Sequence, residues 1–169
     1  MNISELRAWL SYDSETGQFT WLKVSGKSRV GAIAGTPHAK GYVTIGIKRK
    51  QHLAHRLAWA FHYGEWPDRQ VDHKNGNKAD NRIDNLRLAT NQQNHANRGA
   101  QKNSTSGVKG VYWFKPQQKW KAQIQVAGKA IVIGYFDKKD DAIAARREAE
   151  KQYQGEFAHE GAPTLAYAP

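Results

Sequence analysis

The stretch VDHKNGNKADNRIDNLRLATNQQN, residues 71–94, decides the fold of the central part of the chain. It is short of apolar residues, rich in Asp and Asn, and carries an Asn-Gly pair at 75–76 that favours a turn. We therefore expect a hairpin with an irregular loop, whose second strand covers 85–88. Thr90 is followed three residues later by Gln93, the pattern of a capping box, so a helix should begin there.

Two side chains suited to phosphodiester hydrolysis follow the apolar residue that opens this stretch. Asp72 offers a hard oxygen ligand for Mg²⁺ or Mn²⁺, and His73 titrates near neutrality, as a general base requires. Asn94 on the expected helix could supply a second oxygen, and Asn85 could hold the histidine ring or the loop by hydrogen bonds. An Asp-His pair alone is typical of an ordinary exposed turn, so the prediction depends on the whole string.

The charge of the chain indicates an anionic polymer as partner. Its 169 residues carry a formal net charge of +11, and no acid occurs in 16–64 or 86–136. Such a surplus favours nucleic acid, because bound phosphates release condensed counterions. For Arg56 the sequence leaves open a phosphate contact or a bridge from helix to loop. The candidate DNA contacts are Lys48, Arg49, Lys50, Arg56, Lys109, Tyr112, Lys115, Lys121, Gln123, Gln125 and Lys129.

The central string resembles the HNH endonucleases, in particular their phage and intron-borne homing branch with a ββα-metal fold. Asp-His, Asn-Gly, Asp-Asn-Leu-Arg, a Thr cap and a helical Asn follow one another in the order of that family. Upstream, His55-Arg56-Leu57 and Gly41-Tyr42 stand at similar positions, so that the resemblance covers about residues 12–98. His55 itself is more typical of a packing or hydrogen-bonding role than of catalysis.

This resemblance implies a role for each motif residue. His73 would be the general base, Asp72 and Asn94 the metal ligands, and Asn85 the residue that orients the loop and the histidine. The third motif position is Asn rather than His, a variant found in the family, and the neighbouring His95 is an alternative ligand. The implied cofactor is Mg²⁺ or Mn²⁺. Structural zinc held by cysteines is excluded, because the chain has no Cys.

Apolar spacing predicts the remaining elements. In the first part of the chain we expect a helix over 3–10 capped by Asn2 or Ser4, strands at 17–22 and 41–47, and a helix over 53–63 that Gly64 and Pro67 end. In the second part we expect strands near 108–113, 119–126 and 130–136, with a two-residue turn at Ala127-Gly128, and a helix capped by Asp140 or Asp141.

Residues 107–157 resemble the AP2 DNA-binding domain, a three-stranded sheet backed by one helix. The matching residues are Gly110-Val111, Lys119-Trp120, Ala122-Gln123-Ile124, Gly134-Tyr135-Phe136, Ala142, Ala144 and Ala145. The resemblance implies that one sheet face packs on the helix and the other faces a DNA groove. At positions where plant members carry several Arg and Trp, this chain has Lys109, Tyr112, Phe114, Gln123, Gln125, Ala130 and Val132, so their target sequence does not transfer.

The sequence thus predicts an α+β protein with a ββα-metal nuclease domain over 1–98, a linker over 99–107, an AP2-like domain over 108–158 and a tail over 159–169. The expected function is metal-dependent cleavage of double-stranded DNA, by nicking as a monomer or by cutting both strands as a homodimer. Alternatives are a non-catalytic DNA-binding regulator and an RNA-directed nuclease. With no membrane-length apolar run and no signal peptide, we expect a phage or mobile-element protein acting in the bacterial cytoplasm, not at a membrane.

Overall fold

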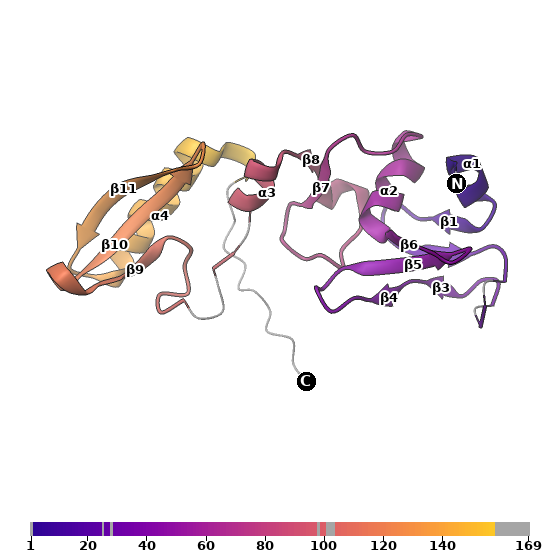
Figure 1. Cartoon of the computed structure of the whole chain (residues 1–169), viewed down its shortest axis with the longest axis horizontal. Helices are drawn as coiled ribbons and strands as arrows, with labels where there is room; N and C mark the ends of the chain where they lie inside the picture. The colour runs from indigo at the N-terminus through magenta and orange to yellow at the C-terminus, as the bar shows by residue number, and fades with distance from the viewer. Residues whose placement is uncertain (1, 25, 28, 98, 101–103, 158–169) are drawn as a thin grey trace. The chain divides into compact units, whose positions relative to one another are not determined.

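The protein is described by a computed structural model that covers residues 2–24, 26–27, 29–97, 99–100 and 104–157. The chain divides into two compact units, Met1–Ala89 and Thr90–Pro169 (Figure 1). The division falls before the expected linker, so the helix that follows the central hairpin is grouped with the second unit. Part of that linker, 101–103, and the expected tail, 159–169, lie outside the described residues. In the described ranges, no helix has both the length and the apolar character needed to cross a membrane.

The first unit combines two small sheets, two helices and a hairpin. Its first helix is shorter than expected, because Leu10 already belongs to a strand, but the Asn2 cap is confirmed as a capping box with Glu5. The antiparallel sheets have the orders β1-β2-β3 and β4-β5-β6. In chain order the elements are α1 (Ile3–Arg7), β1 (Leu10–Tyr12), β2 (Phe19–Trp21), β3 (Ile33–Ala34), β4 (Thr36–Pro37), β5 (Val43–Ile47), β6 (Lys50–Leu53), α2 (Ala54–Tyr63), β7 (Gln70–His73), the 3₁₀ turn η1 (Ile83–Asn85) and β8 (Leu86–Ala89).

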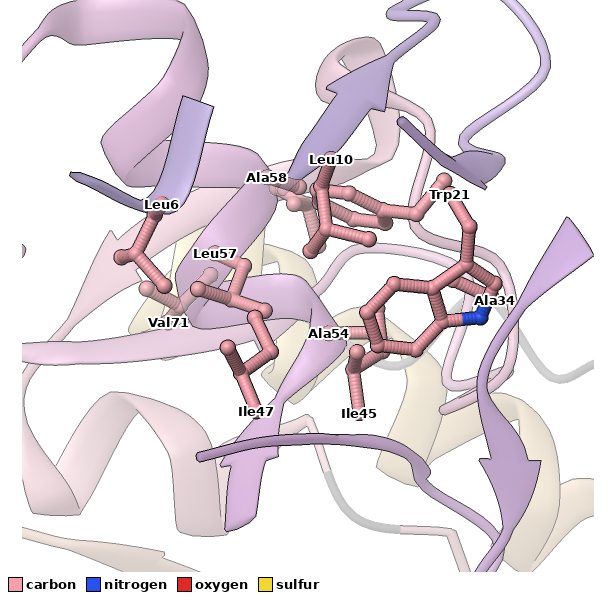
Figure 2. Packing of buried hydrophobic residues seen from close by; sticks show 12 residues of the cluster. Leu6, Leu10, Trp21, Ala34, Ile45, Ile47, Ala54, Leu57, Ala58 and Val71 are labelled. Carbon is pink, nitrogen blue, oxygen red and sulfur yellow. The ribbon is translucent and has the colours of Figure 1, made fainter. Parts of the chain in front are cut away.

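Helix α2 lies at the centre of the core of this unit. Leu57 and Ala58 are fully buried, and Figure 2 shows them among apolar side chains from α1, both sheets and β7. The helix ends as expected at Gly64, which adopts the left-handed conformation (φ 79°) that glycine tolerates best. The core residues are Leu6, Leu10, Phe19, Trp21, Ala34, Ile45, Ile47, Ala54, Leu57, Ala58, Val71 and Leu86. Because Val71 and Leu86 are part of it, the core fixes β7 and β8 in place.

The expected hairpin is confirmed. Strands β7 and β8 pair antiparallel, with Asp72 opposite Arg87 and His73 opposite Leu86. Successive side chains on a strand point to opposite faces, so β7 directs Asp72 to one side of the hairpin and His73 to the other. Burial of Val71 in the core fixes this alternation.

In its described residues, the second unit contains one short helix, a three-stranded antiparallel sheet of order β11-β10-β9 and one long helix. Thr90 caps the short helix through the predicted capping box with Gln93. The expected Ala127-Gly128 turn is confirmed, with both residues at positive φ. In chain order the elements are α3 (Asn91–Ala96), β9 (Val111–Phe114), η2 (Lys115–Gln117), β10 (Lys119–Val126), β11 (Lys129–Phe136), α4 (Lys139–Gln154) and η3 (Gly155–Phe157).

Helix α4 lies along one face of this sheet (Figure 1), as the apolar face of the middle strand predicted. Ala142 packs there against Val111 and Ala122. The expectation that Asp140 or Asp141 caps α4 is wrong: the N-cap is Lys138, and both acids lie in the first turn, where they still favour the helix dipole. A buried ion pair, Arg146 Nη1 to Glu150 Oε1 at 2.9 Å, was not predicted.

Candidate active site

Asp72 is held by an ion pair across the hairpin. The Arg87 guanidinium donates to Asp72 Oδ2 from Nε at 3.1 Å and from Nη2 at 3.0 Å. Both side chains are about nine-tenths buried, and the two residues are register partners on β7 and β8. A two-point contact from a planar guanidinium fixes the orientation of a carboxylate as well as its position. Arg87 was not predicted as a site residue, although its place opposite Asp72 follows from the hairpin.

His73 lies on the other side of β7, in an aromatic environment. Its ring is 3% exposed and packs edge-on against His55 of α2 at 5.0 Å between centroids, with Tyr42 at 6.1 Å. Its Nε2 lies 3.4 Å from Asn81 Oδ1. Burial lowers the pKa of His73 from its ordinary value, against smaller opposing effects from Asn81 and Asp72. The imidazole is therefore neutral near pH 7, the state in which it can accept a proton.

His55 is buried beside the candidate base. It is 5% exposed, and its Nδ1 has no hydrogen-bond partner among the described residues. Burial lowers the pKa of His55 to about 3, with smaller contributions from His73 and Arg56. The packing role expected for His55 is therefore confirmed, and its ring contact with His73 makes it part of the wall of the site.

Asn85 holds the loop that follows His73. Its Oδ1 accepts from the backbone N–H of Asn75 at 3.1 Å, and its Nδ2 donates to the carbonyl of Asp80 at 2.8 Å. Two roles were considered for Asn85, holding the histidine ring or holding the loop, and these bonds show the second. The side chain of Asn81 hydrogen-bonds His73 instead. The sequence did not single out Asn81, because it is one of several Asn in a loop with no periodic pattern.

Asn94 lies on α3, in the second unit. The hairpin that carries Asp72 and His73 belongs to the first unit. The approach of Asn94, or of the alternative ligand His95, to Asp72 stays a prediction.

Of the two predicted metal ligands, Asp72 lies on the hairpin of the first unit and offers a carboxylate, a donor type that suits a hard divalent ion. Within the part of the chain that the structure describes, no group of three or more His, Cys, Asp or Glu is arranged to hold a metal ion. Mg²⁺ commonly takes one or two carboxylates and completes its shell with water and substrate phosphates. Asp72 is a donor of this kind, whereas a zinc site closed by cysteines is impossible in a chain without Cys.

The predicted cations of the first unit fall into two groups. Lys48, Arg49 and Lys50 are exposed at the turn between β5 and β6, where Lys48 and Arg49 adopt positive φ of 47° and 64°. Arg56 instead donates to the carbonyls of Arg69 and Pro67, both at 3.1 Å, so it bridges α2 to the following loop. Its contact with phosphate stays a prediction.

Lys78 was not predicted as a site residue. It lies in the loop after His73, with its ammonium 4.9 Å from the ring centroid of Tyr42, next to the histidine pair. This places a cation at the candidate site.

In the second unit, the predicted DNA contacts gather mainly on the sheet face away from α4. Tyr112, Lys121 and Gln123 share this face, because Tyr112 is the register partner of Lys121 and its hydroxyl bonds Gln123 Oε1 at 3.2 Å. Gln125 is exposed two residues further along β10, and Lys115 and Lys129 are exposed at the turns. Lys109 differs, since its ammonium donates to the carbonyls of His95 and Ala96 at the end of α3.

Comparison with known proteins gives a family match and a relative. Residues 52–96 match the HNH endonuclease family, a span that contains Asp72, His73, Asn85 and Asn94. The chain is also 32% identical over 90 residues to Protein 3.8 of Escherichia phage T7. The aligned segment covers 52% of this chain and 72% of the relative. The chain belongs to the family of T7 Protein 3.8. The HNH endonuclease domain of the chain, given by the match over residues 52–96, contains α2, the β7–β8 hairpin and α3. No solved structure matches the chain.

Proposed function

We propose that this protein is a metal-dependent DNA endonuclease with its active site at Asp72 and His73. The observation that carries the proposal is the placement of a buried, neutral imidazole and an oriented carboxylate on consecutive residues of β7, inside the segment that matches the HNH endonucleases. A base and a hard oxygen ligand are the two groups that hydrolysis of a phosphodiester needs.

In-line displacement assigns a separate task to each of the two side chains. The attacking water and the leaving oxygen stand on opposite sides of the phosphorus, so the base and the charge-stabilising group must approach from different sides. His73 would accept a proton from the attacking water. Asp72 would face the phosphate oxygens on the side of the leaving group, held in place by Arg87. Asn85 would keep the loop after His73 closed.

A Mg²⁺ or Mn²⁺ ion held by Asp72, with Asn94 as a second oxygen ligand, would neutralise charge on the scissile phosphate and the leaving oxygen. For the second unit we propose an AP2-like targeting role, through the sheet face away from α4. The fold of the first unit would be the ββα-metal fold. A phage-encoded enzyme of this kind would act in the cytoplasm of the bacterial host, for example in homing.

The test is cleavage of supercoiled plasmid in Mg²⁺ or Mn²⁺. Wild-type protein should convert it to the nicked circle before the linear form, because each chain has one catalytic centre and nicks as a monomer. His73→Ala should lower the rate by about 10²- to 10⁴-fold, the usual contribution of a general base. His62→Ala, on the exposed side of α2, is the matched control and should cleave like wild type.

Each other outcome has a definite meaning. If no DNA substrate is cleaved with any of the metals, the proposed nuclease activity is contradicted and a non-catalytic DNA-binding regulator is favoured. Faster cleavage of RNA than of DNA would favour an RNA-directed nuclease. Linear product without a nicked precursor would favour a homodimer that cuts both strands.

A further inference from the structure

The sheet of the second unit has one open face with an unusual composition. Helix α4 covers the other face, and strand register assigns the remaining side chains to the open one. We call it the outer face; its residues are Tyr112, Phe114, Lys119, Lys121, Gln123, Gln125, Ala130, Val132 and Tyr135. It combines aromatic rings, two glutamines and two small aliphatic side chains with two lysines, of which Lys119 is paired with Asp137 at 3.4 Å at the end of the sheet. This composition is compatible with an anionic partner. Attraction of phosphate alone, however, does not explain the aromatic, amide and aliphatic side chains of the face.

Lys121, the second lysine of the outer face, is held by the rings around it. Its ammonium lies 5.5 to 5.9 Å from three ring centroids, those of Tyr112, Phe114 and Tyr135. Such cation–π contacts restrain the side chain. Guanine is read most often by a bidentate Arg or Lys, and the outer face offers no Arg for that purpose.

The glutamines are paired across the strands with aliphatic residues. Gln123 of β10 stands opposite Val132 of β11, and Gln125 stands opposite Ala130. Three of these four side chains are exposed, with Val132 at 46%, and Gln123 is half-buried. Directly opposite residues have Cβ atoms about 4.5–5.5 Å apart. Each pair therefore presents an amide and an aliphatic group side by side.

This combination is complementary to the major-groove edge of an A·T base pair. Adenine offers N7 and the N6 amino group, which a glutamine amide can bond bidentately, and thymine offers its methyl group to an apolar side chain. Residues two apart on a strand are separated by about 6.7 Å, close to two base-pair steps of about 3.4 Å. The Gln123–Val132 and Gln125–Ala130 pairs thus match two A·T pairs two steps apart.

Gln123 is also prepared for such contact. The Tyr112 hydroxyl donates to its Oε1 at 3.2 Å. An amide oxygen has two lone pairs, so it can accept this bond and a second one from adenine N6. The tyrosine therefore fixes the amide without consuming its capacity to read a base.

We propose that the outer face reads A·T base pairs in the major groove of double-stranded DNA, through Gln123–Val132 and Gln125–Ala130, with Tyr112 as the positioning residue of Gln123. The inference rests on the proposed function, because it assumes that DNA is the substrate. It commits to B-form DNA, since the major groove of duplex RNA is too deep and narrow for side chains to read.

The test measures binding of the full chain, in EDTA to prevent cleavage, to duplexes of equal length at one salt concentration. Wild type should bind an A·T duplex at least about 5-fold more tightly than a G·C duplex, the lower end for one bidentate pair. Gln123→Ala with Gln125→Ala should remove this preference while binding to the G·C duplex persists. Tyr112→Phe should reduce the preference, and Gln123→Arg should shift it toward G·C. Gln152→Ala, exposed on α4, is the matched control and should keep it.

The outcomes separate this inference from the function on which it rests. Three results would overturn the reading of A·T pairs even if plasmid nicking is intact. They are equal binding of both duplexes, a preference for the G·C duplex, and an A·T preference that persists in the Gln123→Ala, Gln125→Ala double variant. Equal binding of duplex RNA would overturn it too. If no duplex is bound and no plasmid is nicked, the proposed function fails with it. Circular dichroism spectra of each variant that match wild type show that the sheet is folded.

Discussion

Acidification from pH 7 to pH 5 should destabilise the first unit by about 2 kcal/mol through His55 alone. The ordinary pKa of this side chain is 6.5, and burial lowers the pKa in the folded protein to about 3. Below pH 6.5 the unfolded chain takes up a proton on His55 that the folded chain does not, so stability present above this pH is lost as the pH falls. At pH 5, one and a half units below 6.5, the loss is about 2 kcal/mol at about 1.4 kcal/mol per unit.

The assay is urea unfolding at both pH values, with wild type compared with His55→Phe. Phenylalanine keeps a buried ring beside His73 but cannot titrate, so the variant should lose about 2 kcal/mol less than wild type between pH 7 and pH 5. Because burial shifts His73 in the same direction, only this difference isolates His55. The matched control is His62→Phe, exposed on the same helix, which should keep the wild-type pH dependence. Equal losses in wild type and His55→Phe would refute the reasoning.

Three further substitutions test the site and the second unit. Asp72→Asn should cost about 3–5 kcal/mol in urea unfolding, because it removes the charged partner of buried Arg87, and adding Arg87→Met should recover part of the loss; an unchanged midpoint would contradict the role of the ion pair. Asn85→Ala should cost about 1–3 kcal/mol and speed amide exchange in the loop between His73 and Asn85, measured by mass spectrometry. Gly110→Ala should lower one of two calorimetric transitions, because this residue has φ 77° and a Cβ there would collide with the Gln123 carbonyl; two unmoved transitions would argue against that collision.

Features that depend on a few neighbouring residues could be predicted from the sequence. The capping box of Thr90 and Gln93, the end of α2 at Gly64 and the two-residue turn of β10 and β11 are all confirmed. In each case the chemistry that forms the structure lies within about four residues of the chain. The start of α4 was misplaced because two adjacent Asp offered a plausible cap, whereas the N-cap is Lys138, two residues before Asp140, and both Asp lie in the first turn.

Features set by distant contacts could not be predicted. Asn81 reaches His73 because its loop is tied to the N-terminal part of the chain, where Tyr12 donates to the Asn81 carbonyl at 2.8 Å across 69 residues. The burial of Arg146 was not predicted either, because it depends on the distant sheet that covers α4, although the ion pair with Glu150 one turn later is local.

The alternation of β7 also bears on how this site can be altered. Asp72 and His73 point in opposite directions because they are consecutive residues of one strand. Burial of Val71 in the core fixes which face each of them takes. Inserting one residue between Val71 and Asp72 would exchange the faces to which Asp72 and His73 point, and inserting two would restore the original directions. The loop between the strands is under no such constraint as long as Asn85 closes it. The directions of the base and of the ligand are thus set by odd or even position along β7, whatever the length of the loop.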